Sequence, residues 1–312
     1  MVPTVQLKNM SAFAQTAPET STPTRPADGF QWQRWAYKGK RLVFLTFAHA
    51  FCLTIAAGCL FPLVWMISSS LKTQTTIFTD MSLWVSHPHW ENYYWAWTRG
   101  HFGQFFFNSL FYTVAVVTGV ILISSLAAYA FSRLKFPGKN ILFILIISTM
   151  MIPIPGSFIA LYVLLVKLHL VNTRLGYILP QINGGLALGI FLLKTFFDKL
   201  PQDLEDAARI DGCNKFQVYL NVALPLAKPA IAVLVVFNAL AVWNEYLLAM
   251  LVLSDQSLMP LQRGLMVFQG AHLTQYPLLM AGIAISIIPI VTLYFLMQRY
   301  IVAGITAGAL KM

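Results

Sequence analysis

The hydrophobic pattern of the chain consists of long apolar runs separated by short polar segments. Six runs exceed the length of about 20 residues that a helix needs to cross a membrane. The predicted spans are 42–67, 106–131, 141–166, 175–197, 230–253 and 278–302. The pattern therefore predicts an all-α membrane protein with six transmembrane helices.

Composition agrees with a lipid environment. The chain is 58% hydrophobic and only 10% charged, whereas charged residues make up roughly a quarter of an ordinary soluble domain. Its net charge of +10 does not predict a nucleic-acid partner, because the Lys and Arg residues form short clusters between apolar runs rather than one basic face.

The distribution of positive charge predicts the orientation. Lys and Arg near span ends are retained in the cytoplasm. Only a few of the chain's 21 Lys and Arg residues fall in the first, third and fifth connections, namely Lys72, Arg99, Lys167, Arg174 and Arg263. Both termini are therefore expected in the cytoplasm of a cell with a bacterial-type plasma (inner) membrane.

The N-terminus differs from the rest of the chain. Residues 1–40 are rich in Ala, Ser, Thr and Pro and lack the features of a secretory signal, which predicts a disordered cytoplasmic tail. Residues 41–312 are expected to form one transmembrane domain.

The outward connection, residues 68–105, is rich in aromatic residues. They are Trp84, Trp90, Tyr93, Tyr94, Trp95 and Trp97. Two interpretations stay open: an anchor at the lipid headgroups, or a surface that helps to receive an external partner.

The fourth connection, residues 200–225, is predicted to be a helix, a turn and a second helix. Pro201 suits a first helical position, and Gly212 can adopt the left-handed conformation that ends a helix. Asn214 and Gln217 have the spacing of a capping box that begins the second helix. Pro225 is expected to stop that helix.

The second helix of this connection is amphipathic. Phe216, Tyr219, Leu220 and Ala223 fall on one side at spacings of three and four, and so short a helix pair is not stable alone in water. Its apolar side should therefore be buried, either against its own membrane domain or against a separate protein.

The same connection resembles the EAA loop of ABC-importer permeases. The match consists of Asp206, Ala207 and Ala208, then Gly212 after three residues, and Leu224 with Pro225 further on. The resemblance implies a short coupling helix pair that sits in a cleft of an ATP-binding subunit. The coupling residues it implies are Glu205, Asp206, Ala207, Ala208, Asp211, Gly212, Phe216, Leu220 and Pro225.

The acidic position departs from the family pattern. The family usually has Glu where this chain has Asp206, and Glu205 is a neighbouring candidate for the same pairing with a basic partner residue. A local alternative is that Glu205 or Asp206 bridges Arg209 along the helix, which contributes only about 0.2 to 0.5 kcal/mol.

Segments outside the loop resemble the carbohydrate branch of these permeases, and the six-span maltose permease subunit in particular. They are 107–110, 128–138, 243–245, 298–300 and 304–311. The resemblance implies the type I importer permease fold and three partners: an ATP-binding subunit dimer, a second permease and an external solute-binding protein.

ATP and Mg are expected on the partner subunit, because the chain has no Gly-x-x-x-x-Gly-Lys-Ser/Thr loop. We expect no cofactor, no metal and no enzymatic activity in this chain. Oligosaccharides, glycosides and polyols all remain open as the solute.

Asn238, Trp243, Asn244 and Glu245 are the candidates for the translocation path. An ionisable group late in an apolar span is costly unless it faces a partner, a cavity or the interface, and Trp and amide groups suit a sugar. The alternative is a packed helix junction near the outer interface.

The third predicted span contains Pro153, Pro155 and Gly156, which predict a kink that serves either as a gate or as plain architecture.

Two other classes of protein fit the sequence less well. A secondary transporter would require intramembrane charges and internal repeats, and a membrane enzyme would require grouped catalytic residues. The sequence shows neither pattern.

Overall fold

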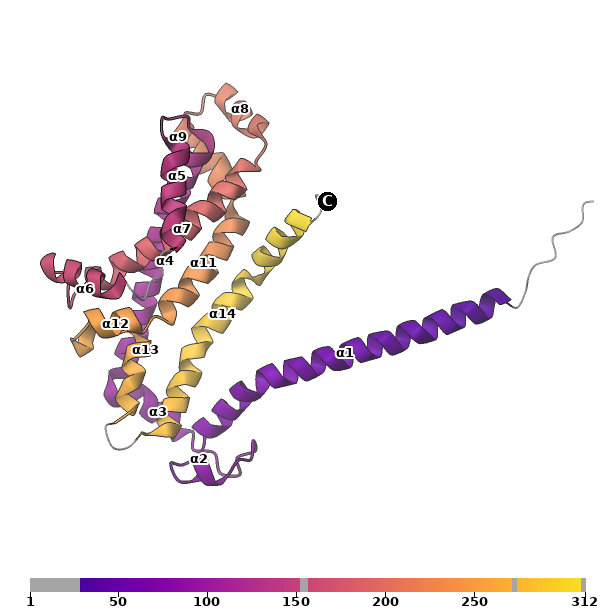
Figure 1. Ribbon diagram of the computed structural model, residues 1–312. Coiled ribbons are helices and arrows are strands. Elements are labelled where there is room, and N and C mark those ends of the chain that lie inside the picture. Colours follow the sequence, from indigo (N-terminus) through magenta and orange to yellow (C-terminus); the bar gives the residue numbers. More distant parts are fainter. Residues whose placement is uncertain (1–28, 152–156, 271–273, 310–312) are drawn as a thin grey trace, which may run out of the picture. The chain divides into compact units, whose positions relative to one another are not determined.

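A computed structural model describes residues 29–151, 157–270 and 274–309 (Figure 1). Those residues are helical apart from their connections, and the described part of the chain contains no strand beyond one isolated bridge between Gln269 and Thr274. The predicted all-α class is confirmed. The chain divides into two compact units, Met1–Phe61 and Pro62–Met312.

Helix α1 (Gly29–Ser70) contains the whole described part of the first unit and the beginning of the second. Its apolar side chains from residue 41 to residue 61 are exposed, with the exception of Ala48, which is half-buried. Residues 1–28 of the predicted tail lie outside the described residues. Residues 29–40, the end of the predicted tail, form the first part of α1, and this proline-free stretch continues into the helix of the apolar run.

Within the described residues, four helices are long and apolar enough to cross a membrane. They are Arg41–Ser70 of α1, α4 (Phe102–Arg133), α7 (Arg174–Asp198) and Tyr276–Arg299 of α14 (Tyr276–Ala309). A fifth is obtained if Lys215–Leu226 and Lys228–Trp243, which meet at a bend of 73°, form one span. These helices confirm four or five of the six predicted runs.

The third predicted run is divided in the structure. Helix α5 (Lys139–Ser148) is followed by the 3₁₀ turn η2 (Thr149–Met151), and α6 (Phe158–Lys167) is a separate helix. Each of these helices is too short to cross a membrane alone. The predicted kink at Pro153, Pro155 and Gly156 lies outside the described residues.

The fifth predicted run is also divided. Helix α11 (Lys228–Trp243) ends where Asn244 begins a short break, and α12 (Leu247–Val252) follows. The remaining short elements lie in the outward connection and between α12 and α14. They are α2 (Thr76–Thr79), α3 (Glu91–Thr98), η1 (Arg99–His101), η5 (Gln256–Leu258), α13 (Leu261–Gly264) and η6 (Leu265–Phe268).

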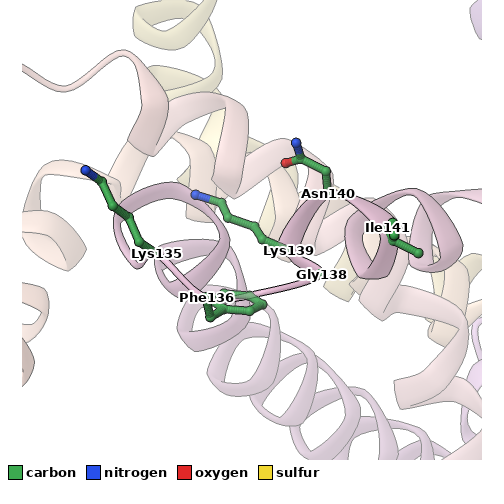
Figure 2. Close-up of a pocket in the computed structure, with 6 residues that line it drawn as sticks. All are labelled: Lys135, Phe136, Gly138, Lys139, Asn140 and Ile141. Carbon is green, nitrogen blue, oxygen red and sulfur yellow. The ribbon is translucent and has the colours of Figure 1, made fainter.

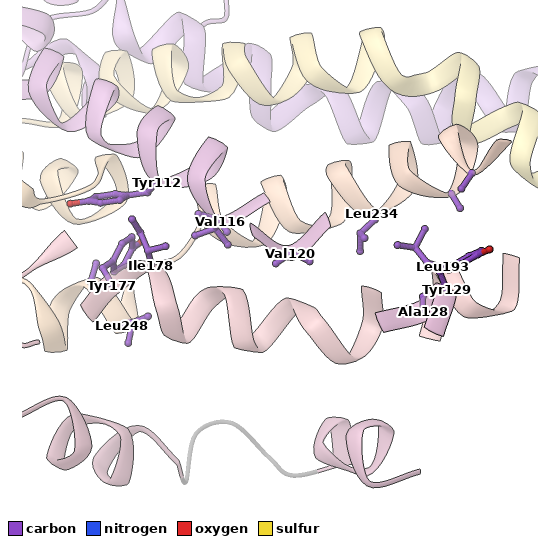
Figure 3. Close-up of a cluster of buried hydrophobic side chains, with 14 of the residues drawn as sticks. Tyr112, Val116, Val120, Ala128, Tyr129, Tyr177, Ile178, Leu193, Leu234 and Leu248 are labelled. Atoms are coloured by element: carbon purple, nitrogen blue, oxygen red, sulfur yellow. The ribbon is translucent and has the colours of Figure 1, made fainter. Parts of the chain in front are cut away.

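The main core lies between α4, α7 and α11 (Figure 3). It contains Tyr112, Val116 and Val120 from α4, Tyr177 and Leu193 from α7, and Leu234 from α11. Close approach of α7 depends on Gly185 and Gly189, since a Cβ on Gly189 would lie 2.8 Å from Ser124 of α4. Small residues on one side of a membrane helix allow this close packing.

A second core lies where α4, α11, α13 and α14 approach α3. Phe102, Phe105, Trp243, Leu261, Phe268 and Leu279 are among its buried members. Gly264 is required there, because a Cβ at this position would collide with the ring of Phe105. This core fixes the end of the long helices that carries α3, opposite the end that carries α8 and α9 (Figure 1).

Candidate functional site

The fourth connection forms a helical hairpin. Its first arm is α8 (Gln202–Ile210). Its second arm begins with α9 (Lys215–Val218), passes through the π-helical turn η4 (Tyr219–Ala223) and ends with α10 (Leu224–Leu226). We call residues 200–226 the coupling hairpin. The predicted order of helix, turn and helix is confirmed.

The turn of the hairpin has the predicted chemistry. Gly212 has a φ of +87°, and the N–H of Cys213 donates to the carbonyl of Ala208 at 3.0 Å, which is the bond that closes a helix C-terminus. Asn214 and Gln217 form the capping box in both directions. Pro201 lies one residue before the first helical position, with an extended ψ of 133°.

The end of the second arm differs from the prediction. Pro225 lies inside α10 rather than after it, and the helix continues to Leu226. The π turn shifts the hydrogen-bond pattern at this point, because the N–H of Leu224 donates to the carbonyl of Tyr219, five residues back. Pro225, which has no N–H to donate, directly follows this shift and is accommodated in the helix. The predicted stop at Pro225 is therefore wrong by one residue.

The apolar side chains of the second arm divide into two groups. Val218, Tyr219 and Ala223 are buried in the membrane domain, whereas Phe216 is 59% exposed and Leu220 is 41% exposed. Tyr219 and Ala223 are thus buried against the chain's own membrane domain, whereas Phe216 and Leu220 are not, which leaves a separate protein as the remaining alternative for these two residues.

The exposed surface of the coupling hairpin lies around its turn. Ile210 is 88% exposed, and several predicted coupling residues are exposed beside it, namely Asp206, Ala207, Asp211, Gly212, Phe216 and Leu220. Pro225 is exposed at the far end of the second arm, and Ala208 is buried. An apolar surface flanked by two carboxylates is suited to a protein partner that offers a cleft and a basic residue.

Glu205 does not belong to this exposed surface. Its residue is 2% exposed, and its Oε1 atom accepts from Nε of Arg133 at 2.5 Å. Nη2 of Arg209 lies 3.6 Å from its other oxygen. Glu205 is therefore bound inside the domain and is not available to a partner, which corrects the expectation that it substitutes for Asp206.

Asp206 is the exposed carboxylate of the pair. Its Oδ1 atom accepts from Nη1 of Arg209 at 2.9 Å, and its side chain is 51% exposed. The predicted local bridge to Arg209 is confirmed for both acidic residues. Sequence reasoning missed Arg133, whose only signal is a basic residue at the end of an apolar run.

A lysine caps the end of α4 beside Arg133. Nζ of Lys139 donates to the carbonyl of Leu134 at 3.1 Å and to that of Ser132 at 3.3 Å, where the helix has unpaired carbonyls. Figure 2 shows Lys135 and Lys139 extending in the same direction from a pocket of about 430 Å³. The end of α4 is thus strongly basic.

A cavity of about 730 Å³ lies between α6, α7 and α11, and two predicted path residues, Asn238 and Glu245, line it. Gln181 and Asn183 of α7 also line it, and sequence reasoning missed both, because a lone amide in an apolar run is also typical of helix packing. The amides and the carboxylate can bind hydroxyl groups.

The other two predicted path residues lie elsewhere. Trp243 is 2% exposed in the second core, and its Nε1 donates to the carbonyl of Ser286 at 3.0 Å. Asn244 lines a separate cavity of about 460 Å³, where Nε2 of Gln262 donates to it at 3.3 Å. The four candidates are therefore distributed over different places, because the helix ends at Trp243 and the following residues change direction.

Glu245 lies in the break between α11 and α12. Its Oε1 atom accepts from the N–H of Leu248 at 2.7 Å, which places a carboxylate at the positive end of α12. The geometry therefore combines the two interpretations of Glu245, since it forms a helix junction and also lines the cavity.

The aromatic residues of the outward connection also divide. Tyr93 is half-buried and shares a 2.8 Å hydrogen bond with Ser70, and the Trp97 ring packs against Phe106. Trp84 is 84% exposed, and Trp90 and Tyr94 are exposed as well. Beneath them, buried Lys72 donates to the carbonyl oxygens of Asp80 and Ser82.

These features define a polytopic helical membrane protein whose long helices carry an exposed helical hairpin at one end. Residues 119–307 match the family described as the inner membrane component of binding-protein-dependent transport systems. The chain belongs to this family of ABC-transporter permeases. It is a transport subunit rather than an enzyme, and this membership replaces the alternatives of a secondary transporter and a membrane enzyme.

Individual relatives cover most of the chain. The trehalose/maltose transport system permease protein MalG of Thermococcus litoralis is 34% identical over 83% of this chain and 94% of its own length. The arabinooligosaccharides permease protein AraQ of Halalkalibacterium halodurans is 33% identical over 86% and 95%.

A solved structure is also similar to the chain. It is the crystal structure of a bacterial ABC transporter involved in the import of the acidic polysaccharide alginate. One of its chains matches with a TM-score of 0.73 and 26% identity, over 84% of this chain and 98% of that one. The fold of the chain is therefore that of an ABC-importer permease.

Proposed function

We propose that the chain is one permease subunit of an ATP-driven importer for carbohydrates or similar polyols. The relatives support this solute class, because their names refer to trehalose, maltose, arabinooligosaccharides and diacetylchitobiose. The observation that carries the proposal is the coupling hairpin, which holds large apolar side chains exposed at its turn.

The coupling hairpin docks into a cleft of the ATP-binding subunit. Burial of Phe216, Leu220 and Ile210 stabilises the complex, since an apolar side chain of this size contributes about 1.5–3 kcal/mol when it is fully buried. Small Ala207 allows close approach, and Asp206 exchanges its local bond to Arg209 for a basic residue of the partner. ATP and Mg belong to that partner.

The chain crosses the membrane six times, with α5–α6 as the divided third span and both termini in the cytoplasm. Residues 41–312 are the transmembrane domain. The hairpin then faces the cytoplasm. Helix α3 lies at the outer end of the long helices, where a solute-binding protein delivers the solute. The open cavity lined by Asn238 and Glu245 becomes half of the translocation path when a second permease closes it.

The orientation is tested with the single cysteine of the hairpin. In a variant with Cys52 and Cys59 replaced by Ser, a membrane-impermeant maleimide should label Cys213 in inside-out vesicles and not in intact cells. The matched control replaces Cys213 as well and introduces Trp84→Cys, which should show the opposite pattern. Labelling of Cys213 from the outside would overturn the proposal.

The docking surface is tested by truncating one exposed aromatic residue. Phe216→Ala should weaken co-purification of the ATP-binding subunit by about tenfold, the effect of losing an interface anchor. The control is Phe191→Ala, which removes a comparably exposed ring from α7, 48% against 59%, and should leave co-purification unchanged. Equal effects of the two substitutions would contradict the docking surface.

A further inference from the structure

Three residues on α4 contact the coupling hairpin, and they are spaced four apart. Ser125, Tyr129 and Arg133 lie at i, i+4 and i+8, which places them along one side of an α-helix. Both arms of the hairpin are attached to this side, each through a different kind of contact.

The first arm is attached by charge. Nε of Arg133 donates to Glu205 of α8 at 2.5 Å, and Nη2 of the same guanidinium donates to the carbonyl of Leu200 at 2.7 Å. The Arg133 side chain is 15% exposed and that of Glu205 is 3% exposed. Because the rigid guanidinium group of Arg133 binds two groups of the first arm in a buried site, it fixes both the orientation of that arm and its distance from α4.

The second arm is attached through its π turn. The hydroxyl of Tyr219 shares a buried 2.8 Å hydrogen bond with Oγ of Ser125, and the Tyr219 ring lies 5.3 Å from that of Tyr129, centroid to centroid. Tyr219 faces inward and is buried, while the next residue, Leu220, is 41% exposed. The residue that binds α4 and the residue that is free to bind a partner are thus neighbours.

Helix α4 in turn packs closely on α7. Gly185 and Gly189 of α7 have no space for a Cβ against Val120 and Ser124 of α4, so these two helices cannot separate or slide without breaking close contacts. Helix α7 also lines the 730 Å³ cavity with Gln181 and Asn183. A continuous series of contacts therefore connects the hairpin, α4, α7 and the cavity.

We infer that α4 receives the movement of the coupling hairpin and passes it to the cavity through α7, with Arg133 and Tyr219 as the positioning residues. This inference rests on the proposed function of the hairpin. It adds a specific prediction: the contacts of Arg133 and Tyr219 are required for transmission but not for docking, because neither side chain lies on the exposed surface.

The test uses the assembled importer, purified through this chain with its ATP-binding subunits and reconstituted in lipid. Native cysteines are replaced, and Asn183→Cys is introduced as a reporter in the cavity. Three quantities are measured: the amount of bound ATP-binding subunit, the rate of ATP hydrolysis, and the change in the maleimide labelling rate of the reporter when Mg-ATP and vanadate are added.

Arg133→Gln should keep the first two quantities within about twofold of wild type and should reduce the nucleotide-dependent labelling change by about tenfold, within the usual range of coupling between sites. Arg209 stays beside Glu205 in this variant, so the carboxylate keeps one cation nearby. Tyr219→Phe removes only a hydroxyl and should reduce the labelling change by a smaller factor. Lys135→Gln is the charge-matched control and should change none of the three quantities.

A double-mutant cycle separates a link from two independent effects. If Arg133 acts through Glu205, the variant Arg133→Gln with Glu205→Gln should lose no more of the labelling change than the more affected single variant. If the losses of the two single variants multiply in the double variant, the inference is overturned. An unchanged labelling response in both Arg133→Gln and Tyr219→Phe would also overturn it.

The failure of the inference differs from the failure of the proposed function. If wild type binds no ATP-binding subunit, the proposed function itself is wrong. If wild type binds the subunit and Arg133→Gln does not, Arg133 shapes the docking surface and transmission through it is refuted.

Discussion

Two buried charges organise opposite ends of the long helices, and they are held in different ways. Glu205 and Lys72 are each 2% exposed. Glu205 is bound by two arginine side chains, one of which lies 72 residues away on α4. Lys72 is bound mainly by the backbone carbonyls of Asp80 and Ser82, only 8 and 10 residues away.

The two charges therefore have different structural roles: Glu205 links two separate elements, whereas Lys72 stabilises a single loop. A carboxylate bound by distant side chains joins two helices, and its contacts can be removed one at a time. An ammonium group bound by nearby carbonyls shapes a single loop, and only the lysine itself can be removed. The contacts at the hairpin end therefore connect separate elements, whereas those of Lys72 hold residues 72–82 in one conformation.

The largest effect is expected from Glu205→Ala. It leaves Arg133 buried without its carboxylate partner, and breaking a buried ion pair from one side costs about 3–5 kcal/mol. Thermal unfolding of the purified subunit in detergent, followed by tryptophan fluorescence, should show a clearly lowered midpoint. Asp206→Ala is the control, since it removes an exposed carboxylate from the same helix, and a similar loss in both variants would contradict the assignment of Glu205 as the buried partner.

A smaller and more local effect is expected from Lys72→Met. The substitution leaves two carbonyl oxygens without their donor, which costs about 1–3 kcal/mol. Hydrogen exchange should accelerate in residues 73–86 and stay unchanged in the coupling hairpin. Lys167→Met, at an exposed lysine on the end of α6, should change neither region. Faster exchange in the hairpin as well would show that the effect of Lys72 is not local.

Gly212→Ala tests the backbone of the turn without a change of charge. A Cβ at this position meets no atom within 4 Å, so the cost of about 1–2 kcal/mol comes from the left-handed conformation alone. Gly212→Asn should cost less, because Asn adopts this conformation more readily. Hydrogen exchange at residues 211–217 measures which of the two variants loses more protection. Equal protection in Gly212→Ala and Gly212→Asn would exclude a backbone cause.

The smallest effect concerns pH at the outer loop. The hydrogen bond from the backbone N–H of Ser82 lowers the pKa of the Asp80 carboxyl, with further help from the Ser82 hydroxyl and Lys72. A lowered pKa means that the ionised form stabilises the loop at any pH above the ordinary carboxyl value of about 3.9. This contribution should disappear as the pH falls below that value toward the pKa in the folded protein.

Hydrogen exchange corrected for the intrinsic rate measures this dependence. Between pH 7 and 5 the protection of residues 80–84 should stay level. Asp80→Asn should show the same lower protection at every pH, and a pH-dependent difference between the two proteins that appears above pH 5 would contradict ionisation of Asp80 as the cause.

Sequence patterns predicted the local features of the hairpin well. The positive φ of Gly212 and the capping box of Asn214 and Gln217 depend on residues within a few positions of one another. The known residue preferences of helix ends therefore predict them directly from the sequence. The long apolar runs likewise identified α4, α7 and α14. These features need no knowledge of the rest of the fold.

The failures concern direction and distance. An apolar run records how hydrophobic a segment is, but it does not record where a helix ends inside the run, so the end of α11 at Trp243 was missed. Burial of Trp243 and the pairing of Arg133 with Glu205 depend on contacts between segments far apart in the chain. Only the family resemblance predicts a docking role for the hairpin, because exposure of Phe216 cannot be read from its periodicity.

The spacing of Ser125, Tyr129 and Arg133 has a mechanical consequence for α4. Four residues exceed one helical turn by about 40°, since a turn takes 3.6 residues. The line of attachment therefore winds around the helix instead of running parallel to its axis. A push from the hairpin along this line exerts torque, and α4 should turn together with α7, because the close contacts of Val120 and Ser124 with Gly185 and Gly189 keep the two helices from sliding.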